Sequence, residues 1–529
     1  MGHLDVKETT APAVFITSHS SSTTTSLQDP PSPDASPDAT PTPLELVSFD
    51  PNDPQNPHNW STKTRIFIVT TGIILTINSS MGSTLTANLF PSLQSEFSLP
   101  PSGPQSVLAA SVYLLGFMTG PLIFAPISES HGRKPVLLVG FILFTLSLVG
   151  SALAPSWESF LVFRFLTGTF GAPPVSVVGG VIADVFREAG ERGVMMIIWS
   201  GATAVGPLSG PVVAGFVGGS TKLGWRWTFW IAVMIAVASL VFVVLLPETL
   251  ADRLLRDKAE KLNKEAGVRR YIAPADLNRG SFWAFMKMTL SRPIRLVCSE
   301  MLLALSCLYL AFVYAIFYML VKIFPLIFIG IYGFSPGMSG VAFCMVGPGT
   351  FIGVGVALWY ATFAPGVSAK HPNKKAEYLR LPMACVGGPP FVLSLLWLGW
   401  SSSPSIHWSV PLMALLPYGS AYLLIFVAMI NYVADAYVIY SASALAAASM
   451  TRSIAGALIP LATDKMLGSL GVAWSCTVLA IISAGLGVVP FLFIAYGEKI
   501  RAGSRFSNSI RVQSGIADEG ELTRSISAV

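Results

Sequence analysis

Apolar residues along the chain gather into long, nearly uncharged runs that short polar segments separate. Each run is long enough to cross about 30 Å of hydrocarbon, which takes about 20 helical residues. The runs do not alternate as membrane strands would, and backbone groups in lipid must pair internally. The pattern therefore predicts twelve membrane-spanning helices, at Ile66–Asn88, Gln105–Ala125, Pro135–Ala154, Phe160–Ala183, Gly193–Val217, Trp227–Leu246, Leu296–Ile323, Gly340–Thr362, Leu381–Trp400, Val410–Ile430, Ala436–Leu461 and Val472–Ala495.

The segments outside these runs divide the chain into parts. Residues 1–58 are rich in Ser, Thr, Pro and Asp, so we expect a disordered tail, and they lack the pattern of a cleavable signal peptide. A charged connection at 247–295 separates a predicted N-terminal six-helix bundle at 59–246 from a C-terminal one at 296–496, and a tail at 497–529 follows. The middle of the connection, ADRLLRDKAEKLNKEAG, has helical spacing and mixed charge, which predicts a surface helix. Two such halves are typical of transporters whose substrate site lies between them.

The distribution of Lys and Arg between the loops predicts the orientation of the chain in the membrane. The chain is 52% hydrophobic and 12% charged, whereas soluble domains are about 25% charged. The net charge is +5, but most Lys and Arg residues fall in the tails and in alternate loops. The opposite loops hold only Lys222, Arg226 and Lys465. This asymmetry predicts cytoplasmic termini and explains the basic balance without a nucleic-acid partner.

The loop between the second and third spans carries GPLIFAPISESHGRKPV, from Gly120 to Val136. Gly132 permits a tight turn, and Glu129 is placed to pair with a cation or to cap a helix start. The following residues, Arg133 and Lys134, would take part in this contact. The alternative is that these two cations only set the topology.

The next two spans carry further motifs. The fourth, RFLTGTFGAPPVSVVGGVIADVF, places Arg164 within the membrane and Asp184 at its cytoplasmic end. A buried arginine costs several kcal/mol unless it is paired or hydrated, so it has either a functional role or a structural hydrogen bond. Small residues in the fifth span allow close helix packing, and its prolines bend the helix; ordinary packing is the alternative. These residues are Gly201, Gly206, Pro207, Gly210, Pro211 and Gly215.

These motifs, together with GWRWTFW, LPET, YGFSPGMSG and the segment from Asn431 to Leu461, resemble those of the major facilitator superfamily. The form is similar to that of fungal twelve-span drug:proton antiporters. The resemblance implies an all-α membrane fold of two pseudo-repeated six-helix bundles, a gating role for the Gly120–Lys134 loop and an antiporter motif in the fifth span. It also implies candidates for proton coupling, namely Arg164, Asp184, Glu300, Asp435 and Arg452.

Four polar residues within apolar runs are candidates for the substrate cavity: Asn78, Tyr314, Lys322 and Tyr437. Lys322 is a cation in the seventh span, where relatives more often have an acidic residue. It either extends to the outer surface or faces the cavity. In the second case it would favour anionic or neutral substrates.

We therefore expect a secondary active transporter, a proton-coupled efflux pump that exports drugs, toxins or secondary metabolites by alternating access. A polyamine exporter and a nutrient facilitator or symporter are the alternatives. The spans lack clustered His, Asp and Cys, which argues against a membrane enzyme. The chain also lacks the phosphate-binding pattern GxxxxGK[ST], which argues against ATP as the energy source.

The expected partners are a small-molecule substrate, protons and the lipid bilayer. We expect no cofactor and no metal, because the six histidines lie in tails or loops and the five cysteines show no CxxC spacing. The protein is expected to act as a monomer in the plasma membrane, with the vacuolar membrane as the alternative.

Overall fold

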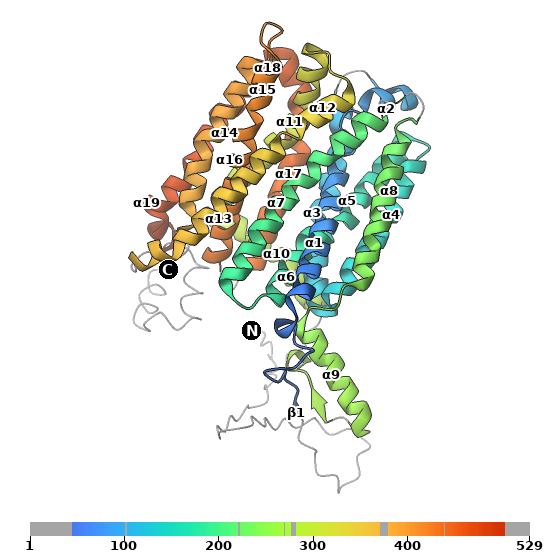
Figure 1. Cartoon of the computed structure of the whole chain (residues 1–529), viewed down its shortest axis with the longest axis vertical. Coiled ribbons are helices and arrows are strands. Elements are labelled where there is room, and N and C mark those ends of the chain that lie inside the picture. Colours follow the sequence, from blue (N-terminus) through green and yellow to red (C-terminus); the bar gives the residue numbers. More distant parts are fainter. Residues whose placement is uncertain are drawn as a thin grey trace, which may run out of the picture.

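Apolar runs fold into helices because hydrocarbon offers their backbone groups no other hydrogen-bond partner. The computed structural model describes residues 45–100, 103–218, 220, 223–268, 270–276, 282–370, 379–437 and 440–502. Long helices lie side by side in one bundle, and a small unit projects from one end of it (Figure 1). We call that end the α9 end and the opposite one the α2 end.

The first half of the bundle contains eight helices. They are α1 (Thr62–Thr84), α2 (Phe90–Phe97), α3 (Gln105–His131), α4 (Arg133–Leu153), α5 (Trp157–Gly171), α6 (Pro173–Val185), α7 (Ala189–Val213) with the π-helical turn η2 (Ala214–Gly218), and α8 (Arg226–Leu245). The predicted fourth span is therefore two helices, since α6 starts at the Pro173–Pro174 pair, where proline is well accommodated in a first helical turn.

The second half of the bundle consists of long helices that short helical turns interrupt. Its elements are α10 (Phe282–Ser299), α11 (Met301–Pro325), η4 (Leu326–Ile331), α12 (Pro336–Phe343), α13 (Val346–Lys370), α14 (Leu381–Ser401), α15 (Ser409–Met413), α16 (Leu415–Ala436), α17 (Ser441–Leu458), η7 (Ile459–Ala462), α18 (Thr463–Gly487) and α19 (Val489–Ala502). The predicted spans Val410–Ile430 and Ala436–Leu461 imply a short turn around Tyr432–Asp435, and this position is wrong, because α16 continues to Ala436 and the chain turns only after it.

Eleven described segments are long and apolar enough to cross a membrane, and the last, Ser441–Gly497, has 57 residues. A straight helix of that length would measure about 85 Å, far more than the hydrocarbon thickness. At Gly471 the backbone leaves the helical region, with φ 70° and ψ 178°. Asp464 lies at the α2 end, whereas Phe493 stacks on Tyr432 toward the α9 end. The segment therefore crosses twice, which confirms the twelve predicted spans.

The small unit at the α9 end joins the start of the described chain to the connection between the halves. Strand β1 (Glu45–Leu46) pairs in parallel with β2 (Tyr271–Ile272), and both lie beside α9 (Ala251–Ala266), which is the predicted surface helix. The 3-10 turn η3 (Pro274–Asp276) also lies beside α9, and the 3-10 turn η1 (Pro57–Asn59) contacts α6 of the bundle. The expectation that the tail is disordered as far as residue 58 is thus wrong for residues 45–58, because an apolar cluster around Val47 and Leu255 orders them. Residues 1–44 and 503–529 lie outside the described residues.

Buried apolar side chains form two large clusters that meet between the halves. One is built from α1–α8 and the other mainly from α11–α19. The second cluster also takes in side chains of α3 and α7. Helix α7 packs on α12 and α13, and α3 packs on α17, and these three contacts form most of the interface.

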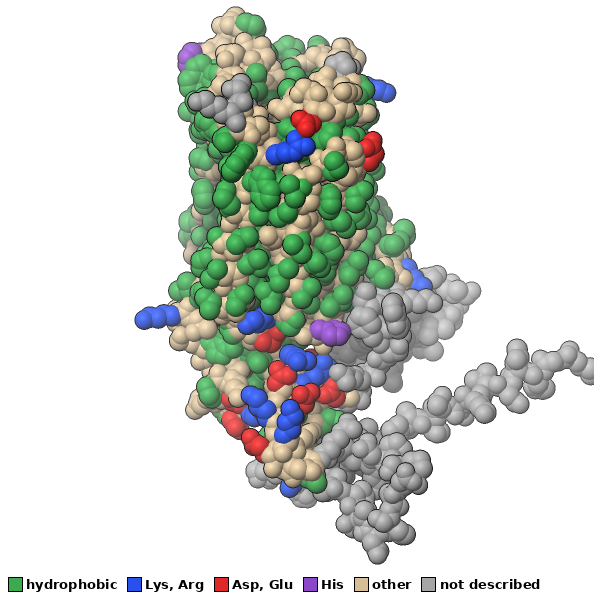
Figure 2. All heavy atoms as spheres, turned by 90° about the vertical axis from the view of Figure 1, so that its right-hand side faces the viewer, with side chains coloured by type: hydrophobic (Ala, Val, Ile, Leu, Met, Phe, Trp, Pro, Cys, Tyr) green, Lys and Arg blue, Asp and Glu red, His purple; other side chains and the backbone are tan. Residues whose placement is uncertain are grey.

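The outer surface of the bundle is apolar. Leu146, Val241 and Leu245 are 59–65% exposed on α4 and α8. Hydrophobic side chains cover the middle of the face in Figure 2, and most charged side chains gather below it, with a few near the top. A surface of this kind is suited to a bilayer rather than to water.

Candidate transport site

A central cavity of about 80 Å³ lies between the two halves. Helices α1, α3, α6 and α7 line it from one side and α11, α16 and α17 from the other. Ligand pockets for drug-sized molecules usually have about 300–1,000 Å³, so the halves must separate before such a molecule enters. The lining residues are Ser80, Ser83, Tyr113, Leu114, Phe117, Val175, Ser200, Thr203, Ala204, Pro207, Tyr314, Phe317, Tyr318, Tyr422, Leu423, Phe426, Val427, Ser449, Arg452 and Ser453.

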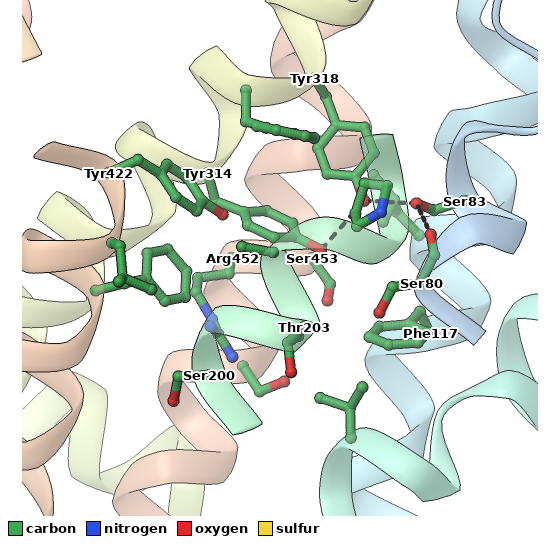
Figure 3. Close-up of a pocket in the computed structure, with 18 of the residues that line it drawn as sticks. Ser80, Ser83, Phe117, Ser200, Thr203, Tyr314, Tyr318, Tyr422, Arg452 and Ser453 are labelled. Carbon is green, nitrogen blue, oxygen red and sulfur yellow. Dashed lines mark hydrogen bonds between the residues drawn. The ribbon is translucent and has the colours of Figure 1, made fainter. Parts of the chain in front are cut away.

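A chain of hydroxyl groups crosses this cavity from α11 to α1 (Figure 3). Tyr318 donates a hydrogen bond of 2.8 Å to Ser83 Oγ, and Ser83 in turn donates to the carbonyl of Ser80 at 2.7 Å. The hydroxyl of Tyr314 lies 3.3 Å from that of Tyr318. Because each hydroxyl has one proton, Tyr314 is the donor in this last bond. The bond from Tyr318 to Ser83 joins the two halves directly.

Arg452 is the charged residue that lines the central cavity. It extends from α17, and its guanidinium carbon lies 4.9 Å from the ring centroid of Phe426 and 5.8 Å from that of Tyr314. Its Nε donates to the carbonyl of Ala448 at 3.2 Å. Tyr422 stacks on Phe426, with ring centroids 5.0 Å apart. A cation over aromatic faces is stabilised by their quadrupoles, and the same faces accept a flat apolar molecule.

A second cavity of about 790 Å³ lies at the α2 end. Ser83 and Tyr318 line both cavities, so their hydrogen bond marks the boundary between them. Lys322 lines the second cavity and pairs with Asp464 at 3.3 Å, while Ser106 donates to the same carboxylate at 2.7 Å. Lys322 was expected either to extend to the outer surface or to face the cavity. It lies toward the end of the bundle and also faces a cavity, so it combines both positions.

The glycines of α7 set how closely the halves and helices approach. A Cβ at Gly210 would overlap Thr84 Oγ1 on α1, and a Cβ at Gly206 would lie 2.9 Å from the carbonyl oxygen of Ile77. A Cβ at Gly215 would lie 2.9 Å from Gly337 Cα on α12, in the other half. The fifth-span motif therefore forms a close contact with the neighbouring helix and with the opposite bundle.

The loop after α3 forms a polar cluster at the α9 end. Glu248 accepts hydrogen bonds from the backbone N–H groups of Arg133 at 2.8 Å and Lys134 at 3.1 Å, which caps the start of α4. The side chain of Arg133 pairs with Asp184 at 3.0 Å. Glu129 is exposed, so the contacts expected of it are made by Asp184 and Glu248. All of these residues belong to the first half and its extension, and the cluster does not bridge the two halves among the described residues.

Arg164 is fully buried one side-chain layer behind the central cavity. Its Nε donates to the carbonyl of Ala109 at 3.2 Å, and its guanidinium carbon lies 4.7 Å from the centroid of the Tyr113 ring. Tyr113 lines the cavity and donates to the carbonyl of Ser79 at 2.6 Å. Arg164 thus holds a cavity-lining side chain in place.

The other expected site residues lie apart from the central cavity. Asn78 donates to Ser239 at 3.0 Å inside the first half. Tyr437 is buried and donates to Glu300 at 3.3 Å, where α11 begins. Asp435 pairs with Arg380 at 3.2 Å near the α9 end and is half exposed. Of the four cavity candidates, Tyr314 and Lys322 therefore face cavities.

Comparison with known proteins identifies the architecture. The family model of the Major Facilitator Superfamily matches residues 72–460. The chain belongs to the Major Facilitator Superfamily. It is 34% identical over 462 residues to the "Major facilitator superfamily multidrug transporter mdrA" of Aspergillus fumigatus, covering 87% of this chain and 75% of that one. It is 35% identical over 467 residues to the "Efflux pump radE" of Floropilus chiversii, covering 87% and 86%.

Solved structures share the fold of this major facilitator protein. The xylose transporter XylE from E. coli, in a partially occluded inward open conformation, matches with a TM-score of 0.58 at 18% identity, covering 82% of this chain and 97% of that one. The human organic anion transporter MFSD10 matches with a TM-score of 0.54 at 18% identity, covering 82% and 100%. The family match and the relatives show a membrane transporter, and its twelve membrane spans form two bundles.

Sequence reasoning on this major facilitator protein missed several residues that line its cavity. Tyr318 lies four residues after Tyr314 and four before Lys322, so all three share one face of α11, and this spacing was a usable signal. Tyr422 and Phe426 have the same spacing on α16. Ser83 gave no signal, because a serine in a membrane helix commonly donates to its own helix backbone, and only packing shows that it also accepts from Tyr318.

Proposed function

We propose that this transporter is a proton-coupled efflux pump that carries small organic molecules out of the cytoplasm across the plasma membrane. The central cavity between the halves is the observation that carries the proposal. It has one charged group and several aromatic rings, and the hydrogen bond from Tyr318 to Ser83 lies at its boundary with a wider cavity. Rocking of the two bundles about this site would expose it to each side in turn. The name of one relative, the efflux pump radE, supports the outward direction.

We infer that the α9 end faces the cytoplasm. Helix α9 and the loop clusters next to it carry most of the described cations, whereas Arg226 and Lys322 lie toward the α2 end. Positive charge accumulates on the cytoplasmic side of membrane proteins. Cysteines introduced at Asp257 and Glu96 should therefore be labelled by an impermeant reagent from the inside and the outside of cells, respectively. The reverse pattern would contradict the orientation.

We also infer that Glu300 carries the coupling proton. Of the three carboxylate candidates it is the buried one, 4% exposed, and its partner Tyr437 is buried as well. Asp184 and Asp435 are less buried and form ion pairs with Arg133 and Arg380, respectively. Since one chain builds the whole cavity, a monomer is sufficient for this cycle.

The test is efflux from proteoliposomes that contain the full chain. With an imposed pH gradient, counter-transport of substrate and protons is expected, and collapse of the gradient with an ionophore should abolish accumulation. Glu300→Gln should retain exchange of substrate at equal pH but lose the response to the gradient, whereas Asp435→Asn is the matched control and should keep both. Substrate flux that ignores the gradient in the unaltered chain would refute antiport. Net uptake in cells would favour a nutrient transporter.

A further inference from the structure

Arg452 is the one charged residue among the described residues that line the central cavity. Its Nε is satisfied by the carbonyl of Ala448, and its guanidinium lies beside two aromatic rings. No carboxylate of the described chain forms an ion pair with it. A cation in apolar surroundings is costly unless a negative group accompanies it. The chain itself provides aromatic faces there but no counter-charge.

The surroundings of Arg452 suit a ligand with an apolar, flat body. Tyr314 and Phe426 flank the guanidinium, and Tyr422 stacks on Phe426. Phe117 faces them from α3 across the cavity (Figure 3). Aromatic rings accept offset-stacked or edge-to-face partners. An acidic side chain would be needed to hold a cationic substrate, and the described lining contains none, so a positive group would meet only repulsion from Arg452.

A polar face of α11 extends from this site toward the second cavity. Tyr314, Tyr318 and Lys322 follow at intervals of four residues, and each interval advances about 6 Å along the helix. Tyr314 lies at Arg452, Tyr318 at the boundary of the cavities, and Lys322 in the second cavity. Two phenol hydroxyls and a second cation thus follow Arg452 in order. Asp464 forms an ion pair with the Lys322 ammonium, and Ser106 donates a hydrogen bond to the Asp464 carboxylate.

We propose that the transported molecules are organic anions with an aromatic or flat apolar body, whose negative group is held by Arg452 and then passes along the Tyr314–Tyr318–Lys322 face of α11. This inference rests on the proposed transport function and adds the substrate class. An anionic group would accept hydrogen bonds from the guanidinium and from the phenol hydroxyls. The ion pair of Lys322 with Asp464 keeps the second cavity close to neutral, so the anion is not trapped there.

The test uses three probes that share one ring system: 2-naphthoate, 2-naphthamide and 2-naphthylmethylammonium. Their binding to the purified full-length chain is measured by competition and by ligand-induced thermal stabilisation. The carboxylate is expected to bind at least tenfold more tightly than the amide, and the ammonium compound more weakly than both. Equal binding of the three, absence of binding by all three, or tightest binding of the ammonium compound would overturn the proposal.

Variants assign the preference to Arg452. Arg452→Gln should abolish the preference for the carboxylate while leaving amide binding within about twofold, and Arg452→Lys should retain most of it. If Arg452→Gln does not fold, Ser200→Asp places a carboxylate in the same cavity while keeping the arginine, and it should remove the preference as well. An unchanged preference in a folded Arg452→Gln chain, or in Ser200→Asp, would overturn the assignment.

The binding assay and the transport assay distinguish a failure of the substrate class from a failure of the transport function. Carboxylate preference in the binding assay without flux under a pH gradient would refute the proton-coupled efflux function and leave the charge preference of the site intact. Flux of the amide or the ammonium probe, with none for the carboxylate, would refute the substrate class and leave transport intact.

Discussion

The hydroxyl of Tyr318 on α11 donates to Ser83 Oγ on α1 at 2.8 Å, and this bond separates the central cavity from the wide cavity at the α2 end. The two residues belong to opposite halves of the bundle. Ser83 Oγ in turn donates a hydrogen bond to the carbonyl oxygen of Ser80 in its own helix. Any movement that opens the central cavity toward the α2 end must break this contact, which makes it part of the barrier.

Tyr318→Phe should open this barrier. A buried hydrogen bond contributes about 1 kcal/mol net, so its loss should raise the open population about fivefold. The measurement is the labelling rate of Ser453→Cys in the central cavity, in a chain whose five native cysteines have been replaced. Ser83→Ala should have the same effect, and combining the two should add little. Tyr309→Phe on the same helix is the control, and equal rates in all variants would show that the bond is no barrier.

Gly210→Ala should destabilise the bundle. Its new methyl group would overlap Thr84 Oγ1 and lie 2.8 Å from the Thr84 carbonyl carbon, so α1 and α7 must move apart. Overpacking of this kind costs about 1–3 kcal/mol. Gly193→Ala is the matched control on the same helix, because nothing lies within 4 Å of its added Cβ. Thermal unfolding in detergent should show a lower transition for the first variant alone, and equal transitions would contradict the packing argument.

Glu248→Gln should weaken the cap of α4. The carboxylate accepts hydrogen bonds from the N–H groups of Arg133 and Lys134, and its charge is favourable at a helix N-terminus. Its loss should cost about 1–2 kcal/mol of stability, measured by thermal unfolding, and should reduce transport. Asp257→Asn removes a surface carboxylate that pairs with Arg253 within α9, where such pairs contribute about 0.3–0.5 kcal/mol. A larger effect of that control than of Glu248→Gln would argue against the cap.

The unit at the α9 end should loosen in acid. The hydrogen bond from Lys258 at 2.7 Å, with help from the Gln55 N–H group, holds the pKa of Asp53 below its usual range. A carboxylate whose pKa is lowered by folding stabilises the unit above its unfolded pKa, and this contribution is lost as the pH falls through the folded pKa. Exchange of the Val47 amide hydrogen, which bonds to the Ile272 carbonyl, should therefore accelerate below the usual pKa range of aspartate.

Asp53→Asn should remove this pH response and show the faster exchange already at neutral pH. Glu260→Gln on the exposed side of α9 is the control and should behave like the unaltered chain. If Asp53→Asn retained the response to acid, another group would be responsible for it.

Several elements were predictable because they depend on local sequence. The run before Gly471 and the run after it were predicted as separate spans although their helices join in one 57-residue segment, since the length of hydrocarbon limits each crossing. Helix α9 was predictable from its spacing of apolar and charged positions. The order of residues 45–58 was not, because it depends on pairing with Tyr271 and Ile272, more than 200 positions along the chain.

The candidate transport site was also predictable only in the part that depends on local sequence. Arg164, Arg452 and Lys322 stood out in the sequence because a charge in an apolar run needs a reason. The sequence could not tell that Arg452 lines the central cavity while Arg164 lies behind Tyr113, because that depends on how α3, α5 and α17 are rotated against one another.

The sequence by itself determined the twelve crossings, the basic end and the motifs of this transporter, because each of these is fixed by the length, apolarity and charge of a short segment. Only the tertiary structure decided which polar groups meet. Tyr318 and Ser83 are 235 positions apart, and Glu248 and Arg133 are 115 apart. Such contacts depend on the packing of whole helices, and hydrophobic periodicity carries little information about it where lipid and protein interior are equally apolar.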